Sequence, residues 1–202
     1  MSHSKILVWD LPTRVFHWAL VLSFVGAFVT ADSERFRDIH VMLGYTMVGL
    51  IAFRLLWGFI GTRYARFESF AFGPRAVLAY LGSLVGRAPQ HYIGHNPAGS
   101  WAIYLLLALG LLSGLSGYVL YAELTGEWAE EAHETVANAM LAVVVVHVLG
   151  VVASSALHRE NLIGAMITGW KYGDPDADVR RAHWVVGTVL LSTVAAYWAG
   201  AF

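Results

Sequence analysis

Cysteine is absent from all 202 residues of the chain. Its absence excludes disulfides, thiolate metal sites, iron–sulfur clusters and the covalent attachment of c-type haem. Charged residues are also scarce, at 13%, where soluble domains carry about a quarter, and 57% of the residues are hydrophobic. With a mean hydropathy of +0.58, this balance indicates a protein that lies in a lipid bilayer. The net charge of −1 carries no information on nucleic acid, and no such partner is expected.

The chain contains several long runs of uncharged residues. A membrane-spanning helix needs about 20 mostly apolar residues. The sequence therefore predicts an all-α membrane protein, a four-helix transmembrane bundle plus a fifth C-terminal helix. We expect a single transmembrane domain over residues 1–202, with spans at about 15–31, 39–60, 101–122, 135–157 and 182–202.

The segments outside these runs are assigned as follows. The first run has the position of a signal peptide, but it is long, contains a histidine and lacks a small-residue cleavage site, so we expect it to remain a span. Short surface helices are predicted within Glu68–Leu84 and Asn161–Trp170.

The distribution of Lys and Arg orients the predicted spans. Ten of them fall on the side of the N-terminus and only two, Arg35 and Arg37, on the opposite side. Cytoplasmic loops carry the excess of positive charge, so this asymmetry predicts a multi-pass protein of the bacterial inner membrane with a cytoplasmic N-terminus. The ten are Lys5, Arg14, Arg63, Arg66, Arg75, Arg87, Arg159, Lys171, Arg180 and Arg181.

Histidine supplies the main remaining metal chemistry, and four histidines are spaced in a regular way. In the fourth span, His133 and His147 are fourteen residues apart. This spacing separates them by about 21 Å along the helix and by only about 40° around it. His17 lies at the depth of His147, and His40 at the depth of His133. We therefore predict an inner pair, His17 with His147, and an outer pair, His40 with His133.

Arg54 follows His40 by fourteen residues, on the same face of the second span and at the inner level. A guanidinium inside a span is costly and usually marks a partner within the bundle. A haem propionate of the inner site is such a partner, through charge-assisted hydrogen bonds. Arg14, one turn from His17, and Arg37, beside His40, are the candidates for other propionates.

These residues also have simpler possible roles. A single histidine in a span is more often a hydrogen-bonded packing residue than a ligand, but four at paired depths favour ligation. Zinc needs three or four converging ligands, whereas a porphyrin iron takes one ligand from each side. His3, His91 and His95 are expected in solvent, and His158 and His183 at the membrane interface. The glycines at positions 44, 49, 110, 114, 117 and 150 serve either close helix packing or space for a macrocycle.

The chain resembles the bacterial cytochrome b561 and nickel-hydrogenase cytochrome b family over about residues 6–172. The resemblance is carried by the run Val8–Trp18, by His40 with Gly44-Tyr45, by Arg54–Gly58, by Gly94–Gly99, and by the pair His133 and His147. It implies a four-helix core with two b-type haems, held by His17, His40, His133 and His147. It also implies electron exchange with the quinone pool. The fifth apolar run departs from the four-helix members.

The predicted function is transmembrane electron transfer between membrane quinone or quinol and a redox partner that we place on the periplasmic side. Two imidazoles on each iron leave no open coordination position, so such centres pass single electrons. The alternatives are the membrane anchor of a nickel–iron hydrogenase and a superoxide:quinone oxidoreductase. From another class, a haem-free transporter lined by His and Arg would be colourless. The partner is therefore a periplasmic c-type cytochrome or hydrogenase subunits, and a homodimer stays open.

The predicted outer loop before the fourth span is acidic. Residues 123–133 hold four carboxylates and neither Lys nor Arg. One interpretation is a solvated rim, since acidic outer loops contribute little to topology. The other is a docking surface for a basic redox protein, because the acidic run ends at His133. Both stay open on the sequence.

Overall fold

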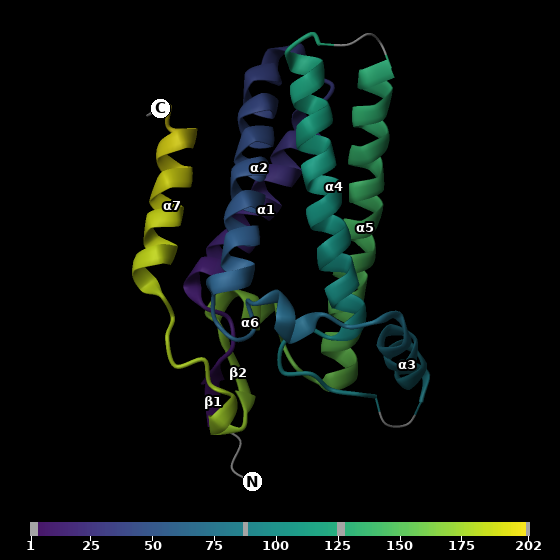
Figure 1. Ribbon diagram of the computed structural model, residues 1–202, viewed down its shortest axis with the longest axis vertical. Helices are drawn as coiled ribbons and strands as arrows, with labels where there is room; N and C mark the ends of the chain where they lie inside the picture. The colour runs from purple at the N-terminus through teal and green to yellow at the C-terminus, as the bar shows by residue number, and fades with distance from the viewer. Residues whose placement is uncertain (1–3, 87–88, 125–127, 201–202) are drawn as a thin grey trace.

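The structure, a computed structural model, describes residues 4–86, 89–124 and 128–200. Within these residues helices dominate, and one pair of short strands joins distant parts of the chain (Figure 1). The elements are β1 Ser4–Leu7, α1 Leu11–Thr30, α2 Arg37–Ile60, α3 Pro74–Val85, α4 Pro97–Tyr121, α5 Trp128–His158, α6 Leu162–Thr168, β2 Trp170–Gly173 and α7 Trp184–Trp198, with 3-10 turns at Glu34–Phe36, Phe67–Phe70 and Pro175–Ala177.

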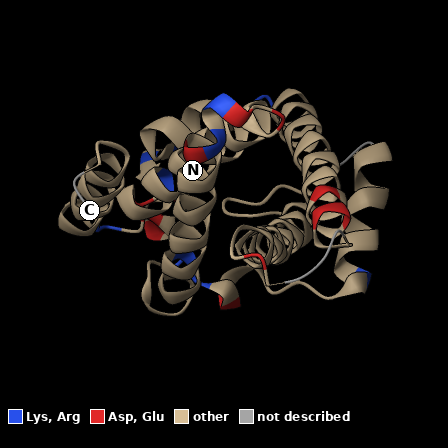
Figure 2. Ribbon diagram, turned by 90° about the horizontal axis from the view of Figure 1, so that it is seen from above, with Lys and Arg blue, Asp and Glu red and all other residues tan. Residues whose placement is uncertain are grey.

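Four helices, α1, α2, α4 and α5, are long and apolar enough to cross a membrane. They run side by side along the long axis of the molecule (Figure 1), and few of their turns carry Lys, Arg, Asp or Glu (Figure 2). This confirms the predicted all-α membrane bundle. Two helices begin four residues earlier than their predicted spans, because the polar caps Asp10 and Asn96 accept from the backbone of Thr13 and Gly99.

The fifth apolar run forms α7, a helix of 15 residues. At 1.5 Å per residue it is about 22 Å long, shorter than the roughly 30 Å hydrocarbon core. It packs against α1, and it stands outside the four long helices on one side (Figures 1 and 2). A fifth complete crossing stays a prediction.

The four long helices form two pairs, α1 with α2 and α4 with α5, and the contact between α2 and α4 joins them. Two of the glycines whose role the sequence leaves undecided lie at this contact between α2 and α4. A methyl group on Gly110 would meet Ile51 at 2.5 Å, and one on Gly114 would meet Val48. Close helix packing therefore accounts for these two glycines.

The strands β1 and β2 were not predicted. They pair antiparallel, with Ser4 opposite Gly173 and Leu7 opposite Trp170. Each strand has only four residues, too few for an alternating pattern to stand out in the sequence. The next two amides of the chain, those of Val8 and Trp9, both donate to the carbonyl oxygen of Gly169.

Asp10, completely buried, joins the start of α1 to the end of α2. One carboxylate oxygen accepts from the backbone of Thr13 at 2.8 Å. The other accepts from the indole nitrogen of Trp57 at 3.0 Å and from the hydroxyl of Thr62 at 2.7 Å. A buried carboxylate is tolerated only when its oxygens are satisfied in this way. The two helix ends are thereby held at one level.

We predict that Asp10→Ala destabilises the chain by about 3–5 kcal/mol, because it removes a helix cap and leaves two buried donors unpaired. Thermal unfolding in detergent measures this as a lowered midpoint. Asp32→Ala, at an exposed aspartate after α1, is the matched control. Equal midpoints for the two variants would contradict the role given to Asp10.

Candidate haem-binding sites

The predicted outer pair is brought together at the end of the bundle far from the N-terminus. His40 lies in the first turn of α2 and His133 in α5, and their ring centroids are 6.1 Å apart with the planes at 79°. The Nδ1 atom of His40 donates to the carbonyl of Ala27 at 2.8 Å. Nδ1 of His133 lies 3.1 Å from the carbonyl oxygen of Ser113 and 3.0 Å from the hydroxyl of Ser116. With a proton on Nδ1, each ring donates to its carbonyl and keeps Nε2 available for a metal.

This arrangement fits one metal ion between two imidazoles. A metal ion held by one nitrogen of each ring, with bonds of about 2.0 Å, would need ring centroids about 6 Å apart. Metal-bound histidines commonly donate their second N–H to a backbone carbonyl, which fixes the tautomer. No group of three or more His, Cys, Asp or Glu gathers among the described residues as a multidentate metal site needs. The residues present fit a bis-imidazole haem.

The predicted inner pair, His17 and His147, comes from α1 and α5. The two imidazoles lie close enough to interact electrostatically. Nδ1 of His17 is buried and makes no hydrogen bond within the described chain. A buried ring nitrogen without a partner is completed by a group from outside the described chain, such as a water, an ion or a bound ligand. Each pair takes one histidine from the half formed by α1 and α2 and the other from α5.

Arg54 is buried in α2, with 3% of its surface exposed. Its guanidinium carbon lies 4.9 Å from the ring centroid of Phe67 and 5.8 Å from that of Phe70. Its Nη1 atom has no hydrogen-bond partner among the described residues. The nearby carboxylate of Asp10 attracts it but already accepts three hydrogen bonds from other groups. The Nη1 donor of Arg54 is therefore available to an acceptor from outside the described chain.

His95 was expected in solvent, and that expectation is wrong. Its ring packs between Trp9 and Phe70, with centroids at 4.7 and 4.5 Å, and its Nδ1 atom is buried without a partner. Burial, together with the positive charges of Arg54 and Lys171, lowers the pKa of His95 to about 3. The ring is therefore neutral near pH 7 and offers either a donor or an acceptor beside Arg54.

The burial of His95 had a weak signal in the sequence. The residue stands in the run Gly94–Gly99, which carries the family resemblance, but a polar turn before a span usually lies in water. The other loop histidines behave differently. His91 is exposed and pairs with Glu160 at 3.2 Å, whereas His3 lies outside the described residues.

The two remaining arginines predicted as propionate partners have different surroundings. Arg14 donates from Nη1 to the carbonyl of Ile167 at 2.7 Å, while its Nε atom is buried and unpartnered. Arg37 is exposed at the start of α2, 3.8 Å from Glu34. Their propionate roles stay predictions.

The glycines near the histidine pairs fall into two kinds. A methyl group on Gly44, one turn from His40, or on Gly150, one turn from His147, would meet nothing within 4 Å. These positions leave open space beside a predicted ligand, as a flat macrocycle requires. Gly117 is different, since a methyl group there would lie 3.1 Å from the ring of His133.

Fold and site together define a class of protein, a helical membrane protein with one pair of facing histidines, His40 and His133, at one end of its bundle. The chain belongs to the prokaryotic cytochrome b561 family, which matches residues 8–169. Membership in this family of b-type cytochromes implies haem b. No solved structure gives a significant match.

Curated relatives cover most of the chain. A protein of Azotobacter vinelandii described as a probable Ni/Fe-hydrogenase B-type cytochrome subunit is 26% identical, over 84% of this chain and 90% of its own length. A protein of the same description from Rhizobium leguminosarum bv. viciae is 25% identical, with the same coverage. The probable Ni/Fe-hydrogenase 1 B-type cytochrome subunit of Escherichia coli K12 is 25% identical, over 57% of this chain and 60% of its own.

We predict that Gly117→Ala displaces the ring of His133 and weakens the outer site. The added methyl group would press on the imidazole and strain its bond to Ser113. Haem per chain and the reduced absorption spectrum measure the loss. Gly49→Ala is the control, because a methyl group there meets nothing within 4 Å. Full haem content in Gly117→Ala would show that the ring of His133 does not need this position.

Proposed function

We propose that this chain carries electrons across the membrane through two b-type haems, one at each histidine pair. The observation that carries the proposal is the outer pair, where two imidazoles 6.1 Å apart each donate Nδ1 to a carbonyl and keep Nε2 for iron. Bound haem supplies a one-electron redox centre. The fourteen-residue spacing of His133 and His147 on the single helix α5 supports two such centres at two depths.

Other side chains would tune the inner centre. Arg54 would pair with a propionate through its unpartnered Nη1, and the neutral His95 would contribute a further hydrogen bond beside it. The aromatic rings of Phe67, Phe70 and Trp9 surround these two polar groups. Within so apolar a shell, the charge of Arg54 would act strongly on a nearby iron.

The proposed electron donor is a hydrogenase, and the acceptor is the quinone pool. The descriptions of the relatives, as probable hydrogenase cytochrome subunits, support the first over a free c-type cytochrome. The excess of Lys and Arg on the N-terminal side supports a cytoplasmic N-terminus, which would put the outer pair on the periplasmic side. A superoxide:quinone oxidoreductase and a haem-free transporter are the rivals, and a colourless protein would favour the transporter.

The acidic stretch beside His133 is the proposed docking surface for the partner. Glu123, Glu130 and Glu131 are exposed, and the last two lie in the first turn of α5. Glu127, the fourth carboxylate, lies outside the described residues. Complementary charge accelerates encounter with a basic partner, and the acceleration weakens as salt is added. The alternative, a solvated rim, would leave electron-transfer rates indifferent to salt.

The purified protein is expected to contain two haems per chain by the pyridine haemochrome assay. His147→Ala should lose the inner haem and spare the outer one, because the pairs share no ligand, and His133→Ala should do the reverse. His91→Ala, at an exposed histidine outside both pairs, is the control and should keep both. One haem or none in the unaltered protein, or equal loss of both haems in either variant, would refute the assignment.

Arg54→Leu should lower the midpoint potential of the inner haem and leave the outer one nearly unchanged. Removing a positive charge from beside an iron stabilises its oxidised form, which carries the extra positive charge. Redox titration followed by absorption measures both potentials in one sample. Arg75→Leu, at an exposed arginine of α3, is the control. A shift confined to the outer haem would show that Arg54 does not lie beside the inner haem.

A further inference from the structure

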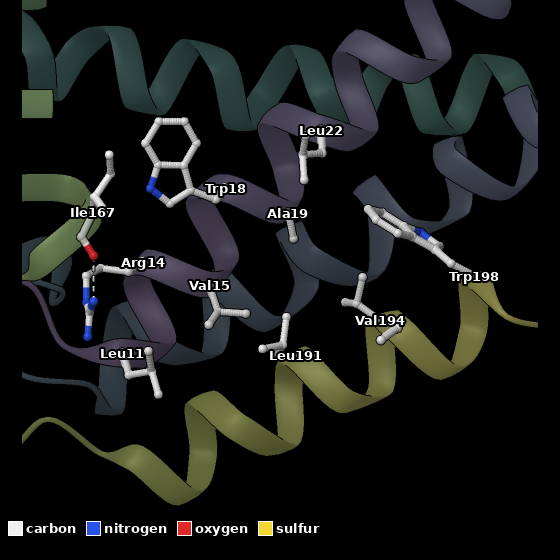
Figure 3. Close-up of a pocket in the computed structure, with 11 residues that line it drawn as sticks. Leu11, Arg14, Val15, Trp18, Ala19, Leu22, Ile167, Leu191, Val194 and Trp198 are labelled. Atoms are coloured by element: carbon white, nitrogen blue, oxygen red, sulfur yellow. Dashed lines mark hydrogen bonds between the residues drawn. The ribbon is translucent and has the colours of Figure 1, made fainter. Parts of the chain in front are cut away.

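A groove lies between α1 and α7 and is closed at one end by α6 (Figure 3). Its cavity is about 290 Å³. Aliphatic side chains line most of its length, with Trp18 towards one end and Trp198 at the other (Figure 3). The groove runs between two apolar helices, of which α1 is long enough to cross a membrane.

Arg14 is the charged residue of this lining, and it lies at the end next to α6 (Figure 3). Its Nη1 atom donates to the carbonyl of Ile167, and its Nε atom is buried without a partner. No carboxylate lines the groove among the described residues. The carboxylate of Asp10 attracts Arg14 but already accepts hydrogen bonds from Thr13, Trp57 and Thr62. Asp10 forms no ion pair with the guanidinium among the described residues, and the Nε donor of Arg14 is left without a partner.

The charged end of the groove lies at the membrane boundary. Arg14 is in the first turn of α1, and this helix of 20 residues is long enough to cross the hydrocarbon core. The amide of Leu11 donates to the carbonyl of Ala182 at 2.9 Å, which holds the segment containing Arg180 and Arg181 close to this end. Both of these arginines are exposed. Two further positive charges thus lie near the polar end of the groove, and the rest of its lining is apolar.

We infer that the groove binds one anionic phospholipid, with its phosphate at Arg14 and an acyl chain along α1 and α7. A phosphate supplies the negative charge and the acceptor oxygens that the guanidinium lacks. A quinone head is neutral and offers only carbonyl acceptors. The indole N–H of Trp18, a further donor in the lining that could bind such a carbonyl, already donates to Met166. The lipid would also fill the space between α1 and the short helix α7, and would hold α7 against the bundle.

The test uses the full-length, haem-loaded protein in a neutral detergent, with native mass spectrometry to count bound lipid. Dioleoyl phosphatidylglycerol and dioleoyl phosphatidylcholine are titrated separately, so that the acyl chains are the same and only the charge differs. We expect one tightly bound phosphatidylglycerol and at least tenfold weaker binding of phosphatidylcholine. Equal affinities would overturn the proposal.

Two variants distinguish binding of the lipid headgroup from binding of its acyl chain. Arg14→Gln should weaken phosphatidylglycerol about tenfold, since it removes a charge-assisted hydrogen bond. Ala195→Phe should weaken it as well, by filling the groove from α7 without touching the guanidinium. Arg75→Gln, at an exposed arginine of α3, should leave the affinity unchanged. An effect of Arg75→Gln equal to that of Arg14→Gln would show general attraction to a basic surface and would overturn the site.

Two further outcomes would overturn the proposal and identify the alternative. If a short-chain ubiquinone displaces phosphatidylglycerol competitively, the groove is a quinone site. If Arg14→Gln leaves lipid affinity unchanged and lowers the potential of the inner haem, Arg14 serves a propionate, as the sequence predicts. Lipid counting does not depend on electron transfer, so a failure here is distinct from a failure of the proposed function.

Discussion

The carboxylate of Asp10 is the interaction on which the inner half of the molecule depends. It caps α1 through Thr13 and reaches α2 through Trp57 and Thr62. This fixes the depth of α1 relative to α2, and with it the level of His17 relative to Arg54. Because helices in lipid gain little from hydrophobic association, directed polar contacts of this kind set their register. The proposed inner site is assembled around that register.

Much of the architecture could be predicted from residue spacing. The four long helices follow from uncharged runs, and the pairing of His40 with His133 follows from depth alone, because helix rise is constant. The missed features have another origin. The strands β1 and β2 are four residues each, and the burial of His95 depends on Trp9 and Phe70, which are distant in sequence. Such long-range contacts leave no local pattern.

The two ends of the bundle differ in how far their polar groups are satisfied. Both outer imidazoles already hold a carbonyl, whereas the buried side-chain nitrogens and oxygens without partners gather at the inner end of the described chain. Native proteins satisfy nearly all such atoms, so these take their partners from outside the described chain, as water, ions or bound groups. The atoms belong to Thr13, Arg14, His17, Arg54, Arg66 and His95.

The short ladder of β1 and β2 has a topological consequence. Its hydrogen bonds join residues 4–7 to residues 170–173, so the stretch of chain that contains the four long helices begins and ends at the same end of the bundle. A stretch of chain whose two ends meet in this way can cross a membrane only an even number of times. The even number of crossings is therefore fixed before the chain reaches α7. Whatever length α7 has, it starts from the same side as β1 and leaves the four long helices unchanged.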